Sequence, residues 1–153
     1  MTKLLGLAFL SALCFTGCTT DSGGDQTIDP TPLAGTVEGQ PWTFTSGATD
    51  AFLSEGSDAF FANFYSVAYT CNASNPSGPA LIVGIPRVPG DYPMSLQRNM
   101  TFTSGSDNKI AVDGLIHVDT VTATTITGGL VGTYDDQNTV SGQFTLTICP
   151  ASN

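Results

Sequence analysis

The residues with the widest chemical range in this chain are its single histidine and its thirteen acidic residues. His117 lies in an alternating stretch whose same face also carries Asp113 and Asp119. A hydrolase could use such a group, because carboxylates act as general acids and bases and a histidine can activate a serine. No serine lies in a G-x-S-x-G motif, however, and thirteen acids supply carboxylate pairs by chance. We expect a solvated histidine and no enzymatic activity, with a small carboxylate-based hydrolase as the alternative.

Two polar stretches offer the oxygen ligands that calcium prefers. One contains Asp135, Asp136 and Asn138, and the other is Asp107-Asn108. Neither has the spacing of an EF-hand loop, and Asp and Asn are equally typical of turns. We therefore expect no cofactor, with calcium in the first stretch as the weak alternative. No cluster of His and Cys has the spacing of a zinc site, and no glycine-rich phosphate loop is present.

The N-terminus has the pattern of an export signal. Lys3 is positive, and residues 4–15 (LLGLAFLSALCF) form an apolar run. As a helix this run is about 18 Å long, whereas the hydrocarbon core of a membrane is about 30 Å thick. Because no second long apolar run follows, we expect no transmembrane helix.

The residues after this run resemble a known processing site. Phe15-Thr16-Gly17-Cys18 is similar to the lipobox of bacterial lipoproteins that signal peptidase II cleaves, with Phe15 in place of the usual Leu. The resemblance implies cleavage before Cys18, acylation of Cys18 and attachment to a membrane through the lipid. Thr19, rather than Asp, follows the cysteine, which implies the outer membrane. The chain thus resembles small bacterial envelope lipoproteins with one functionally unassigned all-β domain, which imply no further site residues.

The number of cysteines agrees with the predicted export and with lipidation of Cys18. Cys14 lies in the signal and Cys18 is used for the lipid, so Cys71 and Cys149 remain as an even pair in an oxidising compartment. We predict a disulfide between them, near the ends of two strands. It closes a loop of about 79 residues and should stabilise the fold by about 4 kcal/mol.

Composition divides the mature chain into a linker and a domain. Residues 19–31 (TTDSGGDQTIDPT) contain three aspartates and two glycines, with Ile28 as the one large apolar residue. This composition is typical of a flexible linker. We predict a signal peptide over 1–17, a lipidated cysteine with an acidic tether over 18–32, and a single domain over 33–153.

Charge excludes one class of partner. Without the signal, Arg87, Arg98 and Lys109 oppose thirteen acids, so the net charge is 3 − 13 = −10. A chain this acidic repels nucleic acid, and it has no basic stripe. We expect no nucleic-acid binding.

Alternation of apolar and polar residues predicts an all-β domain. Two long strands are expected over 109–122 and 143–149, each with one apolar face. In the first strand this face comprises Ile110, Val112, Ile116 and Val118. Residues 124–134 and 139–149 flank a polar turn and are expected to form a hairpin. Residues 81–85 predict a central strand, and 59–69 a strand with a short helix as the alternative.

These elements predict an antiparallel β-sandwich of about eight strands, with a small β-barrel as the alternative. Glu38-Gly39 is expected to turn between two short strands, and Pro41 favours an edge position for the second. The predicted core comprises Trp42, Phe44, Phe61, Phe64, Leu81, Val83, Ile85, Phe102, Ile116, Leu130, Phe144 and Leu146.

For function, we expect a non-enzymatic binding or structural module that is anchored to the membrane by lipid and contacts an envelope protein or a glycan. A glycan-binding module is the more specific alternative, because Trp42, Tyr92 and Tyr134 could form a stacking platform for sugars. Trp42 and Phe44 are two residues apart and would share one face of a strand, so Trp42 is more simply explained as a core residue.

Overall fold

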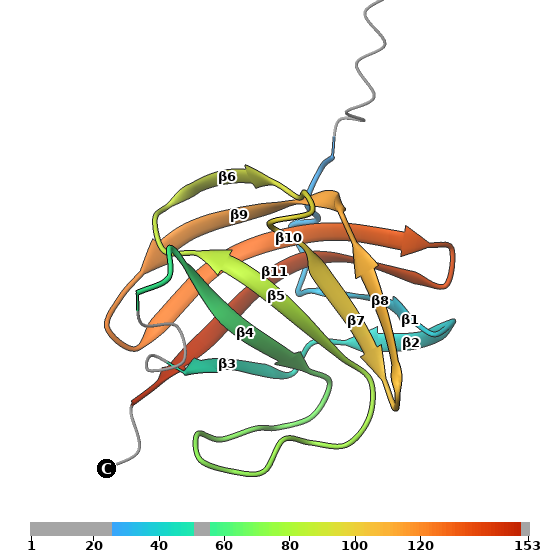
Figure 1. Cartoon of the computed structure of the whole chain (residues 1–153), viewed down its shortest axis with the longest axis horizontal. Coiled ribbons are helices and arrows are strands. Elements are labelled where there is room, and N and C mark those ends of the chain that lie inside the picture. The colour runs from blue at the N-terminus through green and yellow to red at the C-terminus, as the bar shows by residue number, and fades with distance from the viewer. Residues whose placement is uncertain (1–25, 51–55, 151–153) are drawn as a thin grey trace, which may run out of the picture.

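The computed structural model describes residues 26–50 and 56–150, and within these ranges the chain is all-β (Figure 1). Eleven strands form one curled, mixed sheet. They are β1 (Ala34–Val37), β2 (Gln40–Thr43), β3 (Ser46–Asp50), β4 (Ala59–Tyr65), β5 (Ala80–Pro86), β6 (Gly90–Pro93), β7 (Met100–Ser104), β8 (Asp107–Ala111), β9 (Asp113–Val121), β10 (Thr125–Asp135) and β11 (Asn138–Cys149). The described part of the chain contains no helix that could cross a membrane.

The sheet has the strand order β6-β9-β10-β11-β3-β4-β5-β7-β8, and β1 pairs with both β11 and β2. It curls into a half-barrel, so that β8 approaches β10 and β5 approaches β9 although neither pair is adjacent in the sheet. All strand pairs are antiparallel except β11 with β3, which is parallel. The structure therefore confirms the all-β class and adds a parallel pair to the expected antiparallel arrangement.

The core fills the inside of the curl. Ten of the twelve predicted core side chains, Trp42 among them, are buried, and Phe44 is partly buried and packs against them. Fully buried large side chains on opposite parts of the sheet are Phe64, Phe102, Leu81, Ile85, Met100, Ile116, Ile126, Leu130 and Leu146. Burying one Leu, Ile or Phe side chain contributes about 1.5 to 3 kcal/mol, so this core is the main source of stability.

Two hairpins form where turn residues predict them. β10 and β11 pair from Thr125↔Thr147 to Asp135↔Asn138 around the expected polar turn. β1 and β2 pair around Glu38 and Gly39, whose φ angles of 54° and 71° are those of a two-residue turn with both central residues left-handed. β2 has no other partner, so the strand that contains Pro41 is an edge strand as predicted.

The predicted inward position of Phe61 is wrong. Phe61 is 57% exposed, whereas Phe60 is 4% exposed and lies in the core beside Ala62 and Phe64. Residues 59–65 do form a strand, β4. Because two aromatic residues are adjacent here, alternation fits either register, and only pairing with β5 decides which one faces inward.

The single strand predicted over 109–122 is instead two strands, β8 and β9. β8 pairs with β7, whereas β9 pairs with β10 and β6. The buried positions change from odd-numbered to even-numbered residues between the two strands: Ala111 is buried in β8, whereas Ile116 and Val118 are buried in β9. Ile110 and Val112 are therefore exposed, contrary to prediction. Such splitting is also why the sheet has more strands than the eight expected.

Residues 26–33, which we call the N-terminal strap, cross the outer face of the sheet at Ile28 and end beside β11, where Leu33 enters the core. The Thr31 carbonyl accepts a hydrogen bond from the Gln143 amide at 2.8 Å, and the Leu33 amide donates to the Gln143 carbonyl at 2.9 Å. Farther back, the Asp29 amide donates to the Ser141 hydroxyl at 2.9 Å. The chain thus joins the sheet before the domain start predicted at Leu33. The rest of the predicted tether, residues 18–25, and the lipidation residue Cys18 lie outside the described residues.

Candidate functional site

The histidine predicted to be solvated forms a small cluster with two carboxylates on β6 and β9. Asp91 lies directly opposite His117 in the β6–β9 pair. The His117 Nδ1 atom is 2.6 Å from Asp91 Oδ1, and Nε2 is 2.9 Å from Asp119 Oδ1. The hydrogen bond with Asp91, followed by that with Asp119, raises the pKa of His117 above its usual value. The imidazole side chain is 39% exposed, so the cluster lies at the surface.

This cluster lacks the arrangement of a nucleophilic triad. A triad histidine uses one ring nitrogen for a carboxylate and the other for the nucleophile's hydroxyl. In His117 both ring nitrogens face carboxylates. Asp113, expected on the same face, accepts a hydrogen bond from the Gln26 side chain of the strap. The arrangement can hold a protonated histidine and join edge strand β6 to β9.

Two of the three suggested calcium residues, Asp135 and Asn138, hold two turns together. The Asp135 Oδ1 atom accepts hydrogen bonds from the Gln137 amide at 3.0 Å and from Asn138 Nδ2 at 2.8 Å. The hydrogen bond from Asn138 is the main reason why the pKa of Asp135 lies below its usual value. The Asn138 side chain is fully buried and accepts a hydrogen bond from the Glu38 amide at 3.0 Å. These oxygens are thus used within the fold.

The same corner carries the ion pair between Lys109 and Glu38. Its hydrogen bond raises the pKa of Lys109. It connects edge strand β8 to the β1–β2 turn. Among the residues that the structure describes, no group of three or more His, Cys, Asp or Glu side chains is arranged to hold a metal ion.

The three aromatic residues suggested as a sugar platform do not lie on one surface. Trp42 is 3% exposed, and its indole Nε1 donates a hydrogen bond to the Pro79 carbonyl at 3.1 Å. Tyr92 packs partly against the core, and its hydroxyl donates to the Val88 carbonyl at 2.9 Å. Tyr134 is 50% exposed. Trp42 is therefore a core residue, as its spacing from Phe44 indicated.

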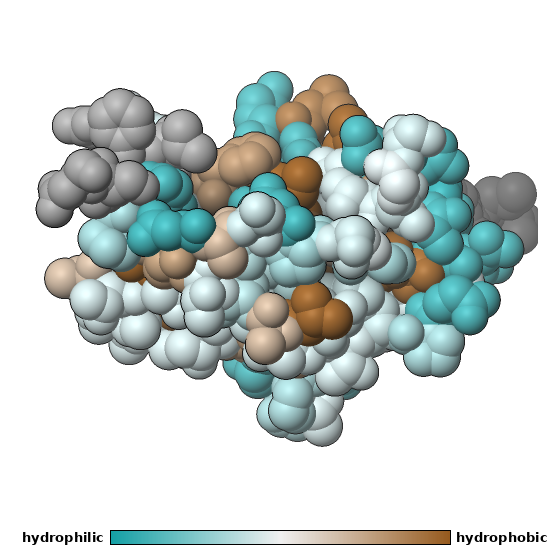
Figure 2. Space-filling model, turned by 90° about the horizontal axis from the view of Figure 1, so that it is seen from below, coloured by the Kyte–Doolittle hydropathy of each residue, from teal (hydrophilic) through white to brown (hydrophobic). Residues whose placement is uncertain are grey.

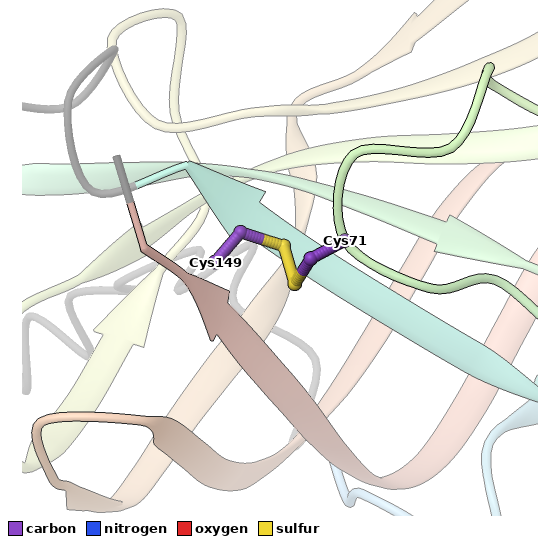
Figure 3. The surroundings of a disulfide bond; sticks show 2 residues. All are labelled: Cys71 and Cys149. Carbon is purple, nitrogen blue, oxygen red and sulfur yellow. A yellow bond between two sulfur atoms is a disulfide. The ribbon is translucent and has the colours of Figure 1, made fainter. Parts of the chain in front are cut away.

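The predicted disulfide is present and fixes the longest described loop, residues 66–79 between β4 and β5. Cys71 in this loop is bonded to Cys149 at the end of β11, with 5.5 Å between their Cα atoms (Figure 3). At the start of the loop, the hydroxyls of Thr45 and Ser46 donate to the carbonyls of Ser66 and Val67 at 2.9 and 2.7 Å. The loop is thus tied to β3 and β11 at one end.

A tyrosine pair holds the middle of the loop. The Tyr65 hydroxyl donates to Asn75 Oδ1 at 3.1 Å, and the Tyr65 and Tyr69 rings are 5.1 Å apart. Tyr65 is on the outer side of β4 yet only 4% exposed, because the loop covers it. This burial, with a smaller contribution from Tyr69, raises the pKa of Tyr65.

Three adjoining hollows of about 320, 400 and 440 Å³ surround this loop, and we call them together the loop groove. The first shares Tyr69 with the second, and it shares Asn63, Tyr65 and Asn75 with the third. Polar and apolar groups both line it, and among the residues that the structure describes Asp50 is its one charged side chain. Seen from below, the end of the molecule that carries the loop is covered mostly by pale and teal residues, with separate brown areas (Figure 2).

Sequence reasoning found the disulfide and His117 but not the loop groove or Asp91. Asp91 meets His117 only through the pairing of β6 with β9, which no spacing along the chain indicates. The groove brings together Asn63 on β4 with Asn72 and Asn75 in the loop. Its one local signal is the unusual density of Asn, Ser and Pro in residues 72–79 (NASNPSGP), which is also typical of any loop.

Comparisons with known proteins give this chain no relatives. No protein-family model matches it, and neither curated proteins nor solved structures give a match. Its function must therefore be argued from its own residues.

Proposed function

We propose that this protein is a lipid-anchored lipoprotein of the bacterial outer membrane whose β domain is a non-enzymatic binding module. The export signal and the Cys18 lipobox support the anchor, as set out above. The loop groove supports binding, because its three hollows have the size of ligand sites, about 300 to 1,000 Å³. Among the described residues, the histidine cluster has no partnering nucleophile, which supports a module without catalysis.

The observation that carries the proposal is the attachment of the N-terminal strap. Hydrogen bonds between β11 and Asp29, Thr31 and Leu33 fix where the chain leaves the domain. Seven residues, 19–25, separate Cys18 from the strap, and a chain of this length can reach at most about 25 Å. A lipid on Cys18 would therefore hold the domain near the bilayer, with the start of the strap on the membrane side.

The loop groove lies at the other end of the molecule. In Figure 1 the strap leaves at the top beside β9, whereas the loop between β4 and β5 lies at the bottom. An anchor attached through the strap thus directs the groove away from the membrane, where soluble or wall-bound ligands can reach it. This separation of anchor and groove is expected of a domain that is held at a membrane and binds its ligand on the side facing away from it.

Metabolic labelling with a palmitate analogue tests the anchor. We expect label on the protein, recovery in outer-membrane fractions, and loss of both in Cys18→Ala. Thr19→Ala is the matched control and should keep the label. An unmodified Cys18 in the mature protein contradicts the proposal.

A fluorescent probe attached to an introduced cysteine tests the orientation, since Cys71 and Cys149 are bonded to each other. Ser77→Cys places the probe in the loop, and Thr133→Cys places it on β10 opposite Asp113, where the strap begins. In vesicles that contain nitroxide lipids we expect stronger quenching at position 133. Equal quenching, or stronger quenching at 77, would reject the orientation.

A further inference from the structure

We propose that the loop groove binds a neutral oligosaccharide. The inference rests on the proposed function for its biological setting, but the groove's chemistry carries it. None of the sugar-platform residues considered from the sequence contributes to the groove, so this is a different site from that one.

The charge of the groove restricts its ligand. The protein has thirteen acids in 153 residues, yet among the described residues Asp50 is the one acid that lines the three hollows. The basic residues Arg87, Arg98 and Lys109 lie elsewhere. A phosphate, sulfate or uronate would find no cation to pair with, and burying an unpaired charge is costly. A ligand without charge fits this lining best.

The lining groups match the hydrogen-bonding pattern of sugar hydroxyls. Asparagine amides both donate and accept, as do the hydroxyls of threonine and tyrosine. Asn63, Asn75 and Tyr65 meet where the first and third hollows adjoin. A sugar ring offers hydroxyls that donate and accept in turn, so every such group can be satisfied.

Tyr69 supplies an apolar surface for the ring of a sugar. It is partly exposed, tilted by 40° against Tyr65, and lines both the first and second hollows. A tyrosine combines an apolar face with a polar end and loses little conformational entropy when it binds. The Tyr65 contact keeps the ring of Tyr69 in place before a ligand arrives.

An extended peptide fits this groove less well than a sugar does. Peptides commonly bind by adding a strand to a free sheet edge. The groove lies over β3, β4 and β5, and each of these is paired on both sides within the sheet. Recognition here must come from side chains, which favours a ligand that brings its own hydroxyls.

The loop is prepared for binding because it is fixed at several points. The disulfide holds Cys71, and the Tyr65 hydroxyl holds Asn75. A loop that is already ordered loses less conformational entropy when its ligand binds. The groove is therefore ready for a weakly bound ligand such as a sugar.

Calorimetric titration of the protein, purified in detergent from membranes, tests the inference with four neutral probes: cellotetraose, maltotetraose, tetra-N-acetylchitotetraose and xylotetraose. We expect at least one to bind with a dissociation constant of about 1 mM or tighter. Tyr69→Ala should weaken that binding at least about tenfold. Asn75→Asp should do the same, because it keeps an acceptor for Tyr65 while removing an amide donor and adding charge.

Tyr134→Ala is the matched control, since Tyr134 is exposed but lies outside the groove, and it should bind normally. Thermal melting checks that each variant is folded. The inference is overturned if no tetrasaccharide binds, if binding survives both groove substitutions, or if a blocked neutral tetrapeptide of serine and glycine binds more tightly than all four sugars.

The same sample separates this inference from the anchor. The mass of the mature protein reports lipidation of Cys18 independently of the titration. If the protein is unmodified but binds a sugar, the sugar site is supported and the lipid anchor is rejected. If the protein is lipidated but binds no sugar, the lipid anchor is supported and the sugar site is rejected.

Discussion

Two segments cover the outer face of the sheet, and they cover it in different ways. The N-terminal strap touches the sheet closely: a Cβ atom added to Gly129 would lie 2.8 Å from the Ile28 side chain, and one on Gly142 would lie 2.5 Å from the Leu33 Cα. The loop of residues 66–79 is held by a disulfide and leaves hollows beneath and beside it. Close contact is suited to attachment, whereas a covalently fixed loop can leave room for a ligand.

The comparison predicts that the loop depends on its disulfide more than the strap depends on any one contact. Cys71→Ala with Cys149→Ala should lower the free energy of unfolding by about 4 kcal/mol, because the open chain regains the entropy of a loop that links residues 78 apart in sequence. Urea denaturation measures this change. If the double variant and the wild type unfold at the same urea concentration, the loop is held by its other contacts and the comparison fails.

Gly142→Ala should damage the strap next most severely. Gly142 has a φ of 141°, and the added methyl group would meet the backbone of Leu33, which cannot move without breaking the strap from β11. We expect a loss of about 3 kcal/mol from backbone strain and overpacking. A stability within 0.5 kcal/mol of wild type, by the same denaturation, would show that the strap adjusts freely; this threshold is about the scatter of surface substitutions.

Gly129→Ala should loosen the strap without unfolding the sheet. Its methyl group meets the ends of the Ile28 and Gln143 side chains, which can give way, so we expect a loss of about 1 to 2 kcal/mol. Gly84→Ala on β5 is the matched control, because nothing lies within 4 Å of its added Cβ, and it should be neutral or slightly stabilising. Limited proteolysis should cut the strap faster in the first variant alone. Equal cutting in both would contradict the close contact at Gly129.

The smallest effect concerns the charged cluster on the strap side of the molecule. The raised pKa of His117 means that its bonds to Asp91 and Asp119 stabilise the fold fully below the unfolded pKa of about 6.5, and that this contribution is lost as pH rises through the folded pKa. Because the cluster is exposed, it contributes less than about 1 kcal/mol. His117→Gln should therefore cost more stability at pH 5.5 than at pH 9, as measured by urea denaturation. A larger loss of stability at pH 9 than at pH 5.5 would contradict a stabilising role for the protonated form of His117.

Local patterns predicted much of the fold because turn chemistry and alternation are properties of neighbouring residues. The β10–β11 hairpin, the turn at Glu38-Gly39 and the edge position of Pro41 all follow from such patterns. Phe61 was misplaced because Phe60 beside it fits the core equally well. Ile110 and Val112 were misplaced because one alternating run serves two strands with different partners.

The candidate site was predicted less well, because it depends on contacts between distant segments. The cysteine count indicated the disulfide without geometry. The groove around it requires the loop to fold over β4, where Asn75 meets Tyr65. The strap was expected to be part of the tether because its composition is polar, and its order comes from backbone hydrogen bonds with β11, which composition does not reveal.

The last described strand has a consequence for how the protein is made. β11 pairs with β1, β3 and β10, and it receives the strap and one half of the disulfide. Because β11 follows the other ten described strands in the sequence, the described sheet is complete only after this strand has been made. The groups β6-β9-β10 and β3-β4-β5-β7-β8 are each paired among themselves, and β11 is the strand that joins them into one sheet.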